Sequence, residues 1–226
     1  ISKVYEQKEH NSTLYPSPVV RGNFIWANGQ QDTKVMFAPD ENGKWYISWL
    51  MPFEESNKYV IEQGKRSPAN KHVGVGGVDS YDIDSTMDGR GSKGACHLFN
   101  KFNMNYPSNM FIAEYAERPP LARVFYEDIL MASVYYGYPL LVENNKYGIV
   151  RYFESRGYDN YIMDRPQHLT PPNQKGNVRT KGVPSNSQEF IQAHAQAIES
   201  HIHEHIGFNA DTGEYGRMYF DRTLED

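Results

Sequence analysis

The chain has 226 residues, which suits one domain or one domain with an extension. Apolar residues make up 39% of it and charged residues 23%, so a packed core is expected and a wholly disordered chain is excluded. The net charge of −5 excludes a global positive field for binding nucleic acid, and the lone cysteine, Cys96, excludes an internal disulfide framework.

The sequence contains neither a signal peptide nor an apolar run of membrane length, so no membrane partner is expected. The chain begins at Ile1 rather than at Met, which indicates a piece of a larger protein. Residues 1–60 are predicted to form an N-terminal extension or linker with short strands, and residues 61–226 the main domain. Apolar and polar residues alternate around Asn-Gly turns in the first part, which is typical of antiparallel strands in an edge hairpin or in the tail of a preceding domain.

The order of the predicted elements after residue 70 indicates the fold class. Strands are predicted within 72–83, 94–103 and 110–117, a helix at 119–137, a strand within 138–145, and helices at 146–157 and 185–207. The helix at 119–137 begins with proline, and Gly137 stands where a C-terminal cap belongs. A hairpin sheet is followed by a strand that the chain reaches through a helix, so we expect this strand to run parallel to a neighbour. The pattern predicts an α/β domain with a mixed sheet flanked by helices.

Two acids stand where apolar strands end. Asp79 closes the first of these strands, and Glu143 closes the strand after the helix. Because the carboxyl ends of parallel strands meet at one edge of a sheet, we expect both carboxylates there. Convergent carboxylates bind Mg²⁺ or Mn²⁺, and a pair of these ions can activate water and stabilise the leaving oxygen of a phosphodiester. The alternative is structural, because Asp and Asn at strand ends commonly form turns and helix caps.

Four stretches of the sequence occur in a characteristic order. They are "GVDSYDID", "FYEDILMASVYYGYPLLVENNKYG", "RTKGVPSNSQEFIQAHAQAIESHI" and "MYFDRTLED". Together they resemble the C-terminal nuclease domain of viral terminase large subunits, most of all those of crAss-like tailed phages, over roughly residues 40–226. The resemblance implies an RNase H-like fold and a metal-dependent endonuclease that cuts double-stranded DNA concatemers during genome packaging, with little sequence specificity.

The resemblance also implies a site and partners. Asp79 and Glu143 would bind two Mg²⁺ or Mn²⁺ ions, and a third acid would come late, at Asp221, at Asp226 or beyond the end of this chain. Asp84 is predicted as an auxiliary ligand, with turn formation as the alternative. The implied partners are double-stranded DNA, the portal protein, the small terminase subunit and an N-terminal ATPase domain outside this chain. The implied location is a packaging motor in the host cytoplasm.

Two glycine-rich loops carry cations that are expected to follow the DNA backbone. Glycine lets the main chain approach a phosphate, and Lys and Arg supply positive charge, although a solvated turn is the ordinary alternative. The predicted DNA-binding residues are Arg90, Lys93, Lys175, Arg179 and Lys181.

The remaining candidates are predicted to be structural. Glu127 or Asp128 could join a metal site, but an exposed helical face near a helix N-terminus is favoured. His201 and His205 have the i,i+4 spacing of some zinc sites, yet they are interpreted as residues of a polar face, and Cys96 as a small buried side chain. Two other functions stay open: a catalytically incomplete module that binds DNA or the portal, and a resolvase-like or transposase-like nuclease.

Overall fold

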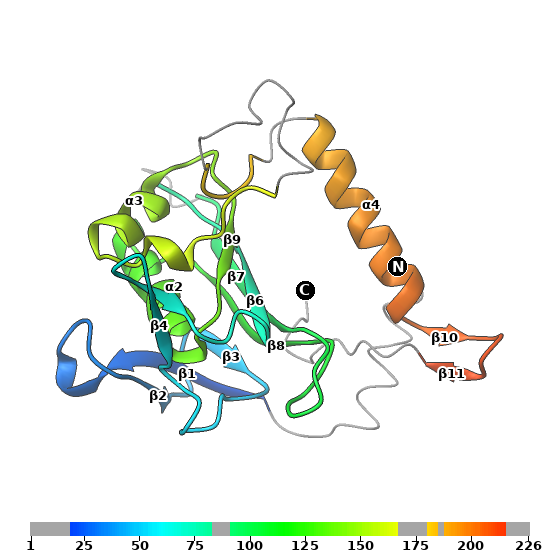
Figure 1. The fold of residues 1–226 in the computed structure, drawn as a ribbon, viewed down its shortest axis with the longest axis horizontal. Coiled ribbons are helices and arrows are strands. Elements are labelled where there is room, and N and C mark those ends of the chain that lie inside the picture. Colours follow the sequence, from blue (N-terminus) through cyan, green and yellow to red (C-terminus); the bar gives the residue numbers. More distant parts are fainter. Residues whose placement is uncertain (1–18, 83–90, 167–179, 185–187, 216–226) are drawn as a thin grey trace.

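A computed structural model of the chain describes residues 19–82, 91–166, 180–184 and 188–215. Seven strands form one mixed sheet, in the order β2-β1-β3-β8-β7-β6-β9, and helices flank it (Figure 1). The predicted α/β class with a mixed sheet is therefore confirmed. The strands of this sheet are β1 (Val20–Trp26), β2 (Val35–Pro39), β3 (Trp45–Ile47), β6 (Gly74–Asp79), β7 (Gly94–Asn100), β8 (Met110–Glu117) and β9 (Leu140–Val142).

The centre of the sheet has the predicted connectivity. Strands β6, β7 and β8 are hydrogen-bonded antiparallel neighbours, and the helix α2 (Ala122–Tyr136) carries the chain from β8 to β9. Because this connection crosses the sheet, β9 lies parallel to β6. The carboxyl ends of β6 and β9 therefore meet at the same edge.

The strands before residue 60 belong to the same sheet. β3 pairs with β8, with Ile47 opposite Ala113, and β1 pairs with both β3 and β2. β1 and β2 thus form an antiparallel hairpin at the sheet edge, and the predicted boundary at residue 60 does not coincide with a boundary of the sheet. The smaller elements are the hairpin of β4 (Tyr59–Glu62) and β5 (Lys65–Pro68), the pair β10 (Phe208–Asn209) and β11 (Glu214–Tyr215), and the 3-10 turns η1 (Ala27–Gly29) and η2 (Asp159–Tyr161).

Three helices complete the described fold. α2 ends at Gly137, whose φ of 66° is the left-handed conformation that glycine adopts without a steric penalty. The other two are α3 (Gly148–Ser155) and α4 (Gln188–His205). Leu98 of β7 points into the core, so the next residue, Phe99, points to the opposite face of the sheet. On that face the centroid of the Phe99 ring lies 6.2 Å from the centroid of the His201 ring of α4. Among the described residues, no helix has the length and apolarity needed to cross a membrane.

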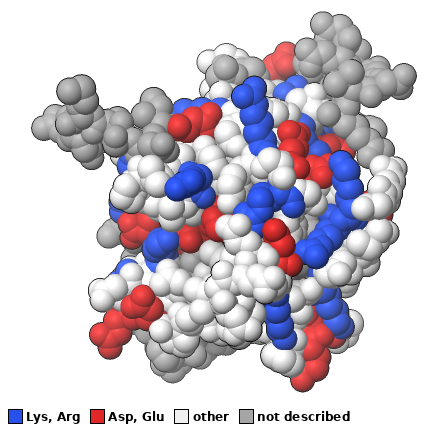
Figure 2. Space-filling model, turned by 90° about the vertical axis from the view of Figure 1, so that its left-hand side faces the viewer, with Lys and Arg blue, Asp and Glu red and all other residues white. Residues whose placement is uncertain are grey.

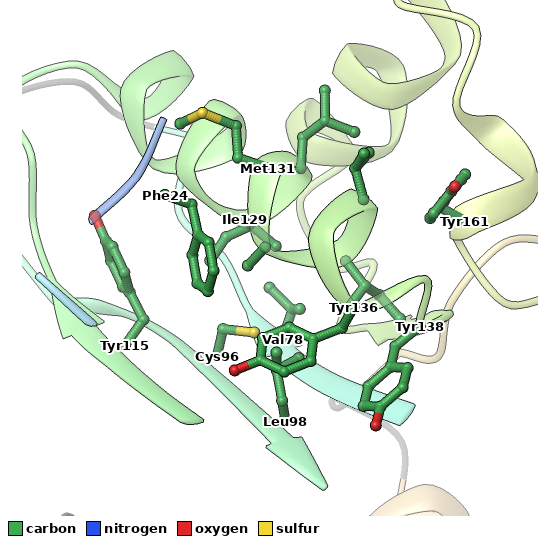
Figure 3. Close-up of a cluster of buried hydrophobic side chains, with 14 of the residues drawn as sticks. Phe24, Val78, Cys96, Leu98, Tyr115, Ile129, Met131, Tyr136, Tyr138 and Tyr161 are labelled. Atoms are coloured by element: carbon green, nitrogen blue, oxygen red, sulfur yellow. The ribbon is translucent and has the colours of Figure 1, made fainter. Parts of the chain in front are cut away.

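The core lies between α2 and the sheet (Figure 3). Val78, Cys96 and Leu98 of the central strands lie beneath Ile129 and Tyr136 of the helix, and all five are buried. α2 has buried residues around its whole circumference, as expected for a helix covered on every side. Cys96 packs there as the predicted small apolar side chain, and burial raises the pKa of its thiol.

One acid of α2, Asp128, is buried, so the prediction of an exposed helical face is wrong for it. Its carboxylate accepts hydrogen bonds from Lys44 Nζ at 2.5 Å and from the Tyr115 hydroxyl at 2.9 Å. The pKa of Asp128 is raised, mainly by burial, although the hydrogen bond from Lys44 works in the opposite direction. Lys44 immediately precedes β3 and Tyr115 belongs to β8, so this acid holds the helix against the sheet.

The neighbouring acid, Glu127, is also covered, by residues that precede and follow α2 in the sequence. Its side chain is only 15% exposed and accepts hydrogen bonds from Trp26 Nε1 at 2.6 Å and from Arg156 Nη1 at 2.7 Å. Arg156 also pairs with Asp32 at 2.7 Å. Glu127 therefore joins β1, α2 and the end of α3, and these contacts cover most of its side chain.

Candidate functional site

The candidate site lies at the carboxyl ends of β6 and β9. Val78 is opposite Val142 in the parallel pair, and the N–H of Glu143 donates to the Val78 carbonyl at 2.9 Å. The following residues, Asp79 and Glu143, therefore leave the sheet side by side, and the proximity of their carboxyl groups shifts the pKa of Asp79. The structure thus brings together the two acids that the sequence singled out.

The neighbouring Glu143 changes the electrostatic environment of Asp79. The pKa of Asp79 is raised from 3.8 to about 6, first by burial and then by the hydrogen bond and the negative charge of Glu143. Lys146 acts in the opposite direction, because its positive charge favours the ionised form of Asp79. A divalent cation would relieve the same repulsion, and carboxylate oxygens are the ligands that Mg²⁺ and Mn²⁺ prefer. The pair therefore fits a metal ion of this class.

The two asparagines after Glu143 explain why the acid is held in place. Asn145 Nδ2 donates to Glu143 Oε1 at 2.6 Å, which orients the carboxylate. Asn144 donates its backbone N–H to the Val183 carbonyl at 2.9 Å and its side-chain amide to the Lys181 carbonyl at 2.7 Å. The "E-N-N" stretch thus supplies one acid, one anchor to the 181–183 segment and one orienting amide.

The chain after Asp79 is anchored to α2. The Tyr81 hydroxyl donates to the Pro119 carbonyl at 2.9 Å, and the Tyr126 hydroxyl lies 2.7 Å from Asp82 Oδ1. Asp82 also lies against the first residue of α3, since a Cβ added at Gly148 would be 2.5 Å from the same oxygen. Asp82 is therefore engaged with α2 and with the N-terminus of α3, where a negative charge is favourable.

The other predicted site residues fall into two groups. Of those within the described residues, Lys93 is exposed one residue before β7, at the edge where Asp79 lies, because Ala95 is opposite Asp79. Lys181 is half-buried, pairs with Asp164 at 3.1 Å and donates to the Ile162 carbonyl at 2.8 Å, so it braces the chain next to β9. Asp84, Arg90, Lys175, Arg179, Asp221 and Asp226 lie outside the described residues.

Two residues at this edge, Lys146 and Asn145, were missed by the sequence reasoning. The signal available was their position within three residues of Glu143, in "ENNK". Within the described ranges, no three His, Cys, Asp or Glu side chains gather as a metal-binding group. Two histidines of α4 lie against aromatic rings instead, His194 near Phe190 and His201 near Phe99.

The face that carries α3 and the β1–β2 hairpin has cations and acids intermixed (Figure 2). Lys65 pairs there with Asp159 at 2.9 Å, and Arg156 is shared between Asp32 and Glu127. These charges neutralise each other locally, so this face does not present the unbroken positive field that a DNA backbone favours.

No protein-family model matches the chain, and no curated protein matches it.

Proposed function

We propose that this chain is a metal-dependent endonuclease of RNase H-like fold that cuts double-stranded DNA concatemers, with little sequence specificity, during viral genome packaging. The observation that carries the proposal is the pair of Asp79 and Glu143, which stand side by side at the ends of adjacent parallel strands. Turn formation does not need two acids to converge, whereas a metal site brings carboxylates together, and such convergence raises the pKa of one of them, as at Asp79.

The topology is compatible with this proposal. The antiparallel strands β8, β7 and β6 are followed by a parallel strand, β9, which the chain reaches through α2. A mixed sheet of this kind collects ligands at the carboxyl ends of its parallel strands, which is where the two acids lie.

In the proposed reaction each residue has a distinct role. Asp79 and Glu143 would hold Mg²⁺ or Mn²⁺, and Asn145 would keep the Glu143 carboxylate oriented. When bound, these ions activate water for attack on phosphorus and stabilise the leaving oxygen. Lys146 and Lys93 would place positive charge beside the phosphate at the same edge.

The proposal extends to the larger assembly only through the resemblance of the sequence. There the partners would be DNA, the portal protein, the small terminase subunit and a separate ATPase domain, and the place would be the host cytoplasm. Tethering to such a motor would raise the local DNA concentration and offset the weak affinity of an acidic domain.

Nicking of supercoiled plasmid tests the proposal. The wild-type chain should convert the plasmid to open-circular and linear forms with Mn²⁺ or Mg²⁺ and not with a chelator. Asp79→Asn and Glu143→Gln should abolish this conversion, since each removes a proposed metal ligand. Asp82→Asn is the matched control and should retain it, because Asp82 lies at the same edge but is engaged with Tyr126.

The outcomes separate the candidate functions. Equal nicking by wild type and Asp79→Asn would refute the assignment of the site. DNA binding without nicking by the folded chain would point to the catalytically incomplete module, and a strong preference for branched DNA would point to a resolvase-like enzyme.

A further inference from the structure

Strand β6 contains three glycines, and only two of them have a packing reason. A Cβ added at Gly74 would lie 2.0 Å from the Tyr138 ring, and one added at Gly76 would lie 2.4 Å from Leu140 Cδ2. A Cβ added at Gly77 would meet nothing within 4 Å among the described residues. Gly77 is exposed although it stands between two hydrogen-bonded neighbours of a seven-stranded sheet.

The usual structural reasons for glycine inside a strand do not apply at Gly77. These reasons are a bulge, a positive φ, or the close approach of another backbone or a ligand. The pairing of β6 with β7 is continuous from Gly74 to Asp79, so there is no bulge, and Gly77 is not among the described glycines with positive φ. Open space above it excludes the close approach of any other described part of the chain. Glycine weakens a strand, and no described part of the chain accounts for it here, whereas the close approach of a ligand would.

The position of Gly77 relative to the acids supports this explanation. Side chains alternate along a strand, so Gly77 and Asp79 face the same side, while Val78 is buried on the other. Across the sheet, Asp79 is opposite Ala95 of β7, which in turn is opposite Ala116 of β8. The surface beside Asp79 on the β7 and β8 side is therefore low, because Ala95 and Ala116 are small, whereas Gly77 itself lies between Leu141 of β9 and His97 of β7.

A polar pair borders this low surface. His97 is opposite Gly77 on β7, and its Nε2 lies 3.4 Å from Glu114 Oε1 on β8. The His97 side chain is 36% exposed, and its ring packs edge-on against the Phe111 ring, with 6.0 Å between the ring centroids. Phe99, two residues further along β7 from the acids than His97, has a ring contact with His201 of α4. The low surface is thus bounded by α4 at one end and by the Asp79–Glu143 pair at the other.

We propose that the nucleic-acid strand to be cut crosses the sheet over Gly77 and Ala95, with its sugar–phosphate backbone lying close to the strands. His97 contacts the same strand from the side as a hydrogen-bond donor. This inference rests on the proposed nuclease function and adds the path of the substrate, with Gly77 as the residue that determines access. A side chain at position 77 would lift the substrate backbone away from Asp79, and a misplacement of about 1 Å can slow a reaction roughly 100-fold.

The test uses Gly77→Val, which adds bulk on the open face of the strand. Its control is Ile25→Trp, which adds bulk to the same face on β1, four strands away in the sheet. Plasmid nicking with Mn²⁺, binding of a fluorescent DNA oligonucleotide with Ca²⁺ in place of Mn²⁺, and the melting temperature are measured for each. We expect Gly77→Val to melt at or above the wild-type temperature, since valine favours strands, yet to nick roughly 100-fold more slowly and to bind the oligonucleotide more weakly. Ile25→Trp should match the wild type.

The outcomes distinguish this inference from the function on which it rests. Wild-type nicking and binding by a stable Gly77→Val variant would overturn the substrate path and leave the nuclease intact. A folded wild-type chain that neither nicks nor binds DNA would overturn both. If Gly77→Val melts early, Gly77→Ala decides, because it adds a single methyl group to open space: slower nicking at an unchanged melting temperature supports the path, and unchanged nicking overturns it.

Discussion

Replacing Asp79 by asparagine should stabilise the metal-free protein at neutral pH. In the wild type, two carboxyl groups meet at the ends of β6 and β9, and the pKa of Asp79 is raised from 3.8 to about 6. Above pH 6 the folded chain must therefore keep Asp79 ionised against burial and against Glu143. The asparagine side chain is neutral and can donate a hydrogen bond to the Glu143 carboxylate, so the substitution removes the repulsion and keeps the contact.

The sign of the effect follows from proton linkage. Between about pH 4 and pH 6 the folded state binds more protons at Asp79 than the unfolded state does. Protonation of Asp79 therefore stabilises the fold fully below pH 4, and this stabilisation is lost as the pH rises through 6. The difference between 3.8 and about 6 corresponds to about 3 kcal/mol at full strength. Asp79 is only partly desolvated, since it stands at an exposed position at the end of β6, so solvent screening reduces this difference to about 1 kcal/mol.

The assay is thermal unfolding in a chelator at pH 7.5 and pH 4.5. For a chain of this size, about 1 kcal/mol corresponds to a rise of about 3 °C in melting temperature for Asp79→Asn at pH 7.5, and the rise should be less than half as large at pH 4.5. Glu41→Gln is the control, because Glu41 is an exposed carboxylate in the turn between β2 and β3. A lower melting temperature for Asp79→Asn at pH 7.5, or an equal rise at both pH values, would refute the reasoning that the two acids repel each other.

Metal binding and the buried contacts of α2 give two other predictions. Binding of Mn²⁺, measured by calorimetry, should weaken as the pH falls through about 6, because Asp79 must lose its proton to bind a metal; an affinity independent of pH between 5 and 7.5 would contradict the assignment of Asp79 as a ligand. Glu127→Ala should lower the free energy of unfolding in urea by about 3 kcal/mol, because it leaves the Trp26 N–H and part of the Arg156 charge without a partner, while Glu127→Gln should have a smaller effect. Equal stability of Glu127→Ala and wild type would show that the contact is dispensable.

The amino-acid sequence by itself determined the local elements and the positions of the two acids. The proline before α2 and Gly137 after it are local signals, since they depend on backbone conformation at single residues, and the helix begins and ends close to where they predict. The ends of β6 and β9 are equally local, because an apolar run stops at Asp79 and another at Glu143. The chain order of strand, helix and strand was then enough to predict that these strands lie parallel and that their acids meet.

Only the tertiary structure decided what long-range contacts do to individual side chains. Glu127 and Asp128 have the sequence positions of exposed helical acids, yet Trp26, Lys44 and Tyr115 cover them, and no local pattern encodes pairings across such distances. The N-terminal strands joined the sheet for the same reason, because β3 finds its partner β8 more than sixty residues later. The three glycines of β6 are indistinguishable in the sequence. Only the tertiary structure reveals that two of them are packed against neighbours, while no described residue lies above the third, Gly77, beside Asp79.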